Sequence, residues 1–224
     1  FMKGEKIKLL TGIVFSNVAG AVVPDVLDGG GIYVSPNAGP SNFAGKECHR
    51  NYYVVSWQND SLHESAGQNA TNLGYKKAFI LYTKLDQTDF AAEMAQIRAA
   101  NPDVVFQFHP GGLGIAFMRQ YAQSGLTVPM VVASPSMDST TLAAVGDAAL
   151  GVNLTAQWNT DLDVPGSKAF VAAFQQKYNR VPTYYAQQGY DTALAIGAAL
   201  KGSGGKVEDT EAFRTAMLKA DFKS

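Results

Sequence analysis

The segment TGIVFSNVAGAVVPDVLDGGGIYVSPNAGP, residues 11–40, has the pattern of a β-α-β unit. It starts inside an apolar run, residues 7–15, that predicts a buried strand, and Ser16 and Asn17 then predict a small polar turn. The apolar run up to Gly30 has helical spacing, and GIYVS predicts a second strand before an irregular loop rich in Pro, Asn and Gly. Because consecutive strands joined through a helix run parallel, this segment predicts a parallel sheet.

The rest of the chain continues this alternation of strands and helices. Further strands are predicted at 51–57, 76–82, 103–108, 128–134 and 151–158, and further helices at 61–74, 88–101, 115–125, 167–179, 186–204 and 208–220. The usual solution for such an alternation is a parallel sheet with helices on both faces. We therefore predict an α/β fold.

The composition limits the class of protein. The 224 residues, 46% of them hydrophobic, suffice for one large domain or two lobes of about 100 residues each. Lys and Arg number 18 against 19 Asp and Glu, so the net charge of −1 offers no basic stripe for nucleic acid. No apolar stretch approaches the ~18 residues that span a bilayer. We expect a globular protein that does not bind nucleic acid.

Motifs for metals, cofactors and catalysis are weak in this sequence. The single cysteine, Cys48, has only His49 beside it at metal-ligand spacing, so no zinc site is expected. Residues 111–114 contain a fragment of a dinucleotide-binding fingerprint, but the full GxGxxG and a Walker motif are absent. We expect no cofactor, no metal and no enzymatic activity. A Rossmann-type nucleotide-dependent oxidoreductase that uses the 111–114 loop is the alternative.

Small polar residues follow four of the predicted strands. Ligands of open parallel sheets lie beyond the carboxyl ends of the strands, and a helix that starts there favours an anion. The recurrence of such loops predicts a binding site for a small carboxylate, although each loop alone is also an ordinary turn. The four loops are Ser16–Asn17, Asn37–Gly39, His109–Gly112 and Ser134–Ser136.

Three segments resemble the type I periplasmic solute-binding proteins of ABC importers, in particular the leucine/isoleucine/valine (branched-chain amino acid) binding protein family. They are residues 11–40, QTDFAAEMAQIRAANPDVVFQFHPGG at 87–112 and YYAQQGYDTALAIGAAL at 184–200. The resemblance implies two Rossmann-like lobes with parallel sheets, joined by a hinge and closing over a ligand in the cleft. It also implies a periplasmic monomer that delivers its ligand to the membrane permease of an ABC importer.

The resemblance further assigns ligand-binding positions in the first lobe. Ser16 and Asn17 match the first ligand loop of the family, and Asn37, Ala38 and Gly39 match the second. In this family such loops hold a carboxylate through hydroxyl groups and backbone amides.

In the second lobe, the resemblance assigns His109 and Ser136 to the ligand site. His109 falls where the family offers a side chain to the ligand; an interior histidine with satisfied hydrogen bonds is the alternative. Ser136 lies in the loop where amino-acid binders have an acidic group, yet residues 134–137 contain no Asp or Glu, although Asp138 is adjacent. The expected ligand is therefore either a branched-chain amino acid or an aromatic or other organic acid that lacks an ammonium group.

The same resemblance predicts the division of the chain. Residues 1–58 plus 161–224 are expected to form lobe 1, with its N-terminal part missing, and residues 59–160 lobe 2. The chain is expected to be incomplete, with roughly two dozen residues missing between Leu81 and Tyr82. Another possibility keeps this fold but makes it the ligand-sensing domain of a regulator.

Overall fold

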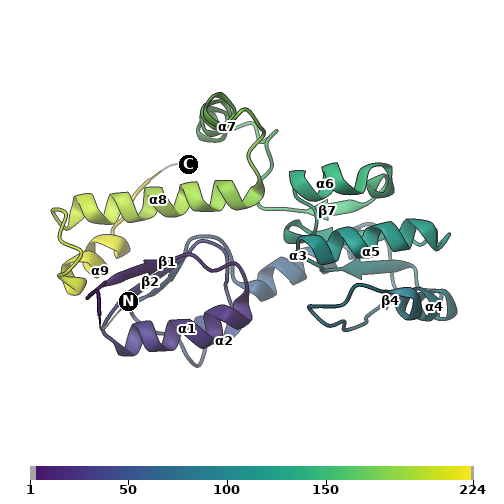
Figure 1. Cartoon of the computed structure of the whole chain (residues 1–224), viewed down its shortest axis with the longest axis horizontal. Coiled ribbons are helices and arrows are strands. Elements are labelled where there is room, and N and C mark those ends of the chain that lie inside the picture. The colour runs from purple at the N-terminus through teal and green to yellow at the C-terminus, as the bar shows by residue number, and fades with distance from the viewer. Residues whose placement is uncertain (1–3, 223–224) are drawn as a thin grey trace. The chain divides into compact units, whose positions relative to one another are not determined.

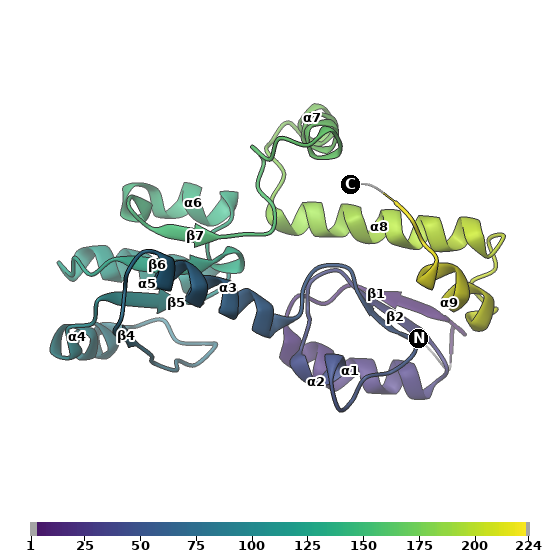
Figure 2. The same cartoon turned by 180° about the vertical axis from the view of Figure 1, so that it is seen from behind.

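A computed structural model describes residues 4–222 and divides the chain into two compact units. One unit holds the described residues up to Ser61 and from Thr160 onward, and the other holds Leu62–Asn159. Figures 1 and 2 label the elements of both. Over residues 4–222, no helix combines the length and the apolar character that a membrane span requires.

The first unit contains a three-stranded parallel sheet in the order β1-β2-β3. The register places Leu9 opposite Ile32 and Tyr33 opposite Tyr52. The elements of this unit are β1 (Leu9–Thr11), α1 (Ser16–Asp28), β2 (Ile32–Ser35), α2 (Ser41–Ala44), β3 (Tyr52–Val54), α7 (Pro165–Tyr178), α8 (Tyr184–Gly202) and α9 (Thr210–Leu218).

Strand β2 is the centre of the first unit, because all four of its residues are buried. Successive side chains of a strand point to opposite faces of the sheet. Tyr33 accordingly packs with Val23 of α1, whereas Ile32 and Val34 pack with residues of α8 and α9 that include Phe213. The sheet therefore lies between two helical layers, with α1 on one side and α8 and α9 on the other (Figure 1).

The second unit contains a four-stranded parallel sheet in the order β4-β5-β6-β7. Helix α3 (Asn59–Asn72) begins at the border of the two units. The other elements are β4 (Ala78–Phe79), α4 (Ala91–Ala100), β5 (Val104–Gln107), α5 (Gly112–Gln123), β6 (Met130–Ala133), the 3-10 helix η1 (Ser134–Ser136), α6 (Ser139–Val145), the 3-10 helix η2 (Gly146–Ala149) and β7 (Asn153–Thr155).

The strand order fixes which helices cover which face of the second sheet. Since the strands follow one another in chain order, right-handed crossovers put α4, α5 and α6 on the same face. The larger apolar cluster lies there and includes Phe90, Val105 and Phe117. On the opposite face Ala66 of α3 packs against Val104.

The predicted α/β class with parallel sheets is confirmed, but several of the predicted elements differ from the structure. The strand predicted at 7–15 is reduced to β1, because Gly12 and Ile13 have φ values of 121° and 63° and turn the chain out of the sheet. Ser16 and Asn17, predicted as a turn, are the first residues of α1. Helix α6 lies where no helix was predicted.

Candidate functional site

The first candidate ligand-binding groups lie at the start of α1, which follows β1 in the chain. The N-cap residue of this helix is Phe15, whose side chain has no hydrogen-bonding group, so the first-turn amide groups have no side-chain cap from it. Ser16 is half-buried, and its Oγ accepts a hydrogen bond from Asn59 Nδ2 at 2.9 Å. Asn17 is exposed and makes no side-chain hydrogen bond with another described residue. The start of α1 can therefore hold an anion through its amides and Ser16.

The loop after β2 is held in one conformation by hydrogen bonds to its carbonyl groups. Asn37, Ala38 and Gly39 are all buried. The carbonyl of Ala38 accepts hydrogen bonds from Ser35 Oγ at 2.5 Å and from the Tyr52 hydroxyl at 3.1 Å. The Ala38 methyl group belongs to the apolar core, so only its backbone is available to a ligand.

Gly39 lies against the segment that follows β3. A Cβ atom at this position would lie 2.1 Å from the carbonyl oxygen of Trp57, so only glycine fits. The Gly39 carbonyl also accepts a hydrogen bond from the Asn59 N–H at 2.8 Å. Because the Asn59 side chain binds Ser16, this residue joins the start of α1 to the loop after β2. No local pattern of the sequence indicates this role of Asn59, because it depends on a contact 43 positions away along the chain.

Asn37 connects the same loop to α8. Its Nδ2 donates a hydrogen bond to Gln188 Oε1 at 2.8 Å, and the two side chains are only 8% and 2% exposed. Nε2 of Gln188 has no partner among residues 4–222. Trp57 stacks on Tyr184, the first residue of α8, with ring centroids 5.0 Å apart. The loop after β2 therefore has both an amide pair and an aromatic pair beside it.

In the second unit, the structure brings His109 and Ser136 together. The His109 N–H donates a hydrogen bond to Ser136 Oγ at 2.9 Å, and Ser136 is fully buried. A Cβ atom at Gly114 of α5 would lie 2.2 Å from the His109 carbonyl oxygen, so α5 begins closely packed against this pair. The Ser134 hydroxyl nearby is buried and has no partner among the described residues.

The imidazole of His109 has a hydrogen-bond partner at each ring nitrogen. Nε2 lies 2.8 Å from Thr83 Oγ1, and Nδ1 lies 3.0 Å from Nε2 of Gln107. Since an amide nitrogen only donates, Nδ1 accepts and the Nε2–H donates to Thr83. The rings of Phe90 and Phe117 pack on the imidazole at centroid distances of 5.4 and 4.8 Å. Both nitrogens are therefore engaged inside the second unit, which no local pattern of the sequence indicates.

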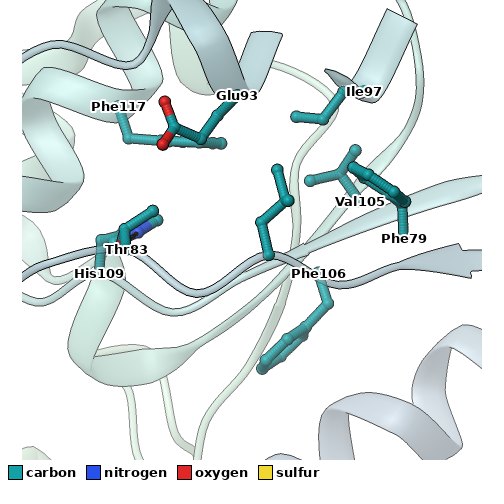
Figure 3. A pocket seen from close by; sticks show the side chains of 9 residues that line it. Phe79, Thr83, Glu93, Ile97, Val105, Phe106, His109 and Phe117 are labelled. Carbon is teal, nitrogen blue, oxygen red and sulfur yellow. Dashed lines mark hydrogen bonds between the residues drawn. The ribbon is translucent and has the colours of Figure 1, made fainter. Parts of the chain in front are cut away.

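The pocket that His109 lines is too small for an organic acid (Figure 3). Its volume of about 30 Å³ has room for a water molecule or two, whereas small-molecule sites usually exceed about 300 Å³. The residues that line it are Phe79, Leu81, Thr83, Glu93, Ile97, Val105, Phe106, His109 and Phe117.

His109 should make the stability of the protein depend on pH. Burial lowers the pKa of His109 from 6.5 to about 4, and the nearby Glu93 carboxylate opposes this shift. The unfolded state therefore binds more protons between these values, and the free energy of unfolding should fall as the pH drops from 6.5 to 4. Because the ring is partly exposed, we expect a loss of about 1–3 kcal/mol.

Urea unfolding at several pH values, with His109→Gln as the matched variant, measures this loss. The variant should lose less stability on acidification than the natural chain. Equal pH dependence of the two proteins would show that His109 is not responsible.

The sequence profile of one family, described as periplasmic binding protein, matches residues 1–85 and 81–224. The chain belongs to the periplasmic binding proteins. This confirms the family that the resemblance indicated, and periplasmic binding proteins are a transport-associated family of binding proteins rather than of enzymes. None of the curated protein sequences compared with the chain matches it.

Solved structures of periplasmic binding proteins share this fold. A solute-binding protein of an ABC transporter from R. palustris, in complex with benzoate, is 26% identical with a TM-score of 0.95, and the alignment covers 100% of this chain and 70% of that one. A second R. palustris protein, in complex with 4-hydroxybenzoate, is 22% identical with a TM-score of 0.87, over 98% of this chain and 67% of that one. A leucine-binding protein from Thermotoga maritima is 18% identical with a TM-score of 0.84, and the alignment covers 96% of this chain and 69% of that one.

Proposed function

We propose that this periplasmic binding protein is the substrate-binding component of an ABC importer and that its ligand is an aromatic monocarboxylate. In this proposal it works in the periplasm as a monomer and delivers the ligand to a membrane permease without transforming it. The likeness over the whole chain to the benzoate-bound protein of R. palustris supports this choice of ligand.

The observation that supports it most is the lack of acidic residues in the loops after β2, β5 and β6, at 36–40, 108–111 and 134–137. A desolvated ammonium group needs a carboxylate or several acceptors, so an α-amino acid would find no charged partner in these loops. Asp138 is adjacent, but its carboxylate accepts a hydrogen bond from the Thr141 N–H at 2.8 Å and caps α6. A ligand without an ammonium group avoids the cost of burying a positive charge that has no charged partner.

The first unit offers groups that suit both ends of such a ligand. The amides at the start of α1 and the Ser16 hydroxyl favour a carboxylate, because helix N-termini attract anions. The half-buried Trp57 ring, which stacks on the buried ring of Tyr184, is an aromatic group of the kind that lines small-molecule sites. Neutral amides and hydroxyls combined with aromatic rings therefore favour a benzoate-like acid.

A thermal-shift screen tests the ligand class. Benzoate or a hydroxybenzoate at a hundredfold excess over its dissociation constant should stabilise the chain by ~2.7 kcal/mol and raise its melting temperature. Benzyl alcohol, which keeps the ring but lacks the carboxylate, is the matched control and should have little effect. A shift with leucine alone would reassign the ligand to the amino acids, and a shift with NAD alone would support the oxidoreductase alternative.

Asn37→Ala should weaken both folding and binding. The substitution removes the hydrogen bond to Gln188 and leaves a buried amide without a partner, which costs about 1–3 kcal/mol. Since the loop after β2 then loses its connection to α8, we expect benzoate affinity to fall about tenfold or more.

Asn17→Ala is the matched control for the effect of Asn37→Ala on stability, and unfolding experiments compare the two. Because Asn17 is exposed, its loss should change stability by less than about 0.5 kcal/mol. Calorimetric titration of Asn37→Ala with benzoate measures the change in affinity, and an affinity equal to that of the natural chain would contradict the proposed role of the Asn37 loop.

A further inference from the structure

Two tyrosines of the first sheet donate hydrogen bonds to the loops that hold the candidate ligand groups of this unit. Tyr33 of β2 and Tyr52 of β3 are paired in the register, and their nearly parallel rings stack with centroids 5.9 Å apart. The Tyr33 hydroxyl donates to the carbonyl of Gly12, between β1 and α1, at 2.6 Å. The Tyr52 hydroxyl donates to the carbonyl of Ala38, in the loop after β2, at 3.1 Å. One stacked pair of rings therefore contacts both the backbone that leads into α1 and the loop after β2.

The turn between β1 and α1 has a strained backbone. Ile13 has a φ of 63°, a conformation that β-branched residues rarely adopt. Strained residues of this kind cluster at functional sites and persist only where their surroundings hold them. Here the hydrogen bond from Tyr33 fixes the preceding carbonyl, and the Ile13 side chain packs on the apolar cluster that contains Val23 of α1. The direction in which α1 starts, and with it the position of Ser16, therefore depends on these contacts.

Packing explains the rings of these tyrosines but does not explain their hydroxyl groups. Tyr33 is fully buried, and Tyr52 is half-buried against the apolar cluster between the sheet and α1. Phenylalanine would fill nearly the same space, and a hydroxyl group in an apolar core is costly unless it has a hydrogen-bond partner. Each of these hydroxyl groups has a loop carbonyl as its partner. The hydroxyl groups therefore act on the loops.

Tyr53 is a tyrosine of the same strand without such a contact. It follows Tyr52 in β3, so its side chain points to the other face of the sheet, where it packs with the cluster that includes Phe213. Its hydroxyl group is buried and has no hydrogen-bond partner among residues 4–222. Tyr53 is therefore a matched control, because its hydroxyl group holds neither loop.

We propose that Tyr33 and Tyr52 are positioning residues, whose hydroxyl groups hold the start of α1 and the loop after β2 in the conformation that binds the ligand carboxylate. This inference rests on the proposed function, because it assigns the carboxylate to the first unit. Neither hydroxyl group touches the ligand. Each acts through the carbonyl that it binds, which is that of Gly12 before α1 or that of Ala38 after β2.

Titration of Tyr33→Phe and Tyr52→Phe with benzoate tests this proposal. Phenylalanine keeps the ring and removes only the hydrogen bond, so both variants should fold and bind one benzoate per chain. Their dissociation constants should exceed that of the natural chain by about fivefold or more, because each loop loses a contact that fixes its conformation. Tyr53→Phe removes a buried hydroxyl group from the same strand and should bind benzoate with the affinity of the natural chain.

Hydrogen exchange without ligand separates positioning from general stability. The Ala19 amide closes the first turn of α1 with a hydrogen bond of 3.0 Å, and the Asn59 amide donates to the loop after β2 at 2.8 Å. Tyr33→Phe should speed exchange at Ala19 by about tenfold. Tyr52→Phe should have the same effect at Asn59. The Phe213 amide, which closes the first turn of α9 at 2.9 Å, reports the general stability of the unit and should change less.

Two results would overturn the proposal. One is that exchange speeds up by the same factor at all three amides while the affinity for benzoate is unchanged, because the hydroxyl groups then only stabilise the fold. The other is that Tyr53→Phe weakens binding as much as the other two substitutions. If the natural chain itself does not bind benzoate, the proposed ligand is wrong, and exchange at Ala19 and Asn59 still decides whether the hydroxyl groups hold the two loops.

Discussion

Gly39→Ala should lower the free energy of unfolding by about 3 kcal/mol or more and abolish ligand binding at the loop after β2. The new Cβ atom would lie 2.1 Å from the carbonyl oxygen of Trp57 and 3.2 Å from Cα of Gln58. Both contacts are with backbone, so no side chain can rotate to relieve them, and the loop must move away from β3. Such a shift also breaks the hydrogen bond from the Asn59 N–H to the Gly39 carbonyl.

Gly20→Ala is the matched control for this substitution. Gly20 lies inside α1, and a Cβ atom there would have no atom within 4 Å. Alanine should therefore stabilise the helix by about 0.5–1 kcal/mol. Denaturant unfolding of both variants, with titration of benzoate, measures the two effects. If Gly39→Ala keeps the stability and affinity of the natural chain, the fixed conformation of this loop is unnecessary for binding.

Phe90→Ala should lower the free energy of unfolding by about 3–5 kcal/mol. Phe90 is completely buried, and its ring contacts those of Phe117 and His109. Its removal leaves a cavity beside the imidazole. Because burial is the main cause of the low pKa of His109, water in this cavity should raise that pKa toward 6.5.

Two measurements check the Phe90 prediction, namely thermal unfolding and a titration of the His109 ring protons by NMR. Tyr82→Ala is the control, since its side chain is 96% exposed and its loss should change stability by less than about 0.5 kcal/mol. An unchanged His109 pKa in a destabilised Phe90→Ala protein would mean that other groups keep the imidazole neutral.

The fold was largely predictable from hydrophobic periodicity, and the differences have local causes. The unit at residues 11–40 forms β1, α1 and β2, because the apolar runs had the length and spacing of these elements. The predicted strand at 76–82 is mostly unpaired, because a strand needs a partner that periodicity does not reveal. Positive φ values at Gly12 and Ile13 end β1 early. The positive φ at Ile13 was not predictable from the residue type, because β-branched residues rarely adopt this conformation.

The candidate site was predictable only in part. Residue types at strand ends pointed to Ser16 and to the loop that contains Asn37, since parallel strands bring their carboxyl ends to one edge. The partners Asn59 and Gln188 were not foreseen, because they lie 43 and 151 positions away along the chain. Such contacts are set by tertiary packing, which the pattern of a single sequence does not contain.

The first unit consists of two stretches of chain with the whole second unit between them. The ribosome makes proteins from the N-terminus, and domains fold as units while they emerge. Residues 62–159 are therefore complete before α8 or α9 exists, whereas Ile32 and Val34 of β2 gain their cover only when Phe213 has been synthesised. During translation this strand exposes an aggregation-prone surface, so the nascent N-terminal region is where a chaperone would be needed.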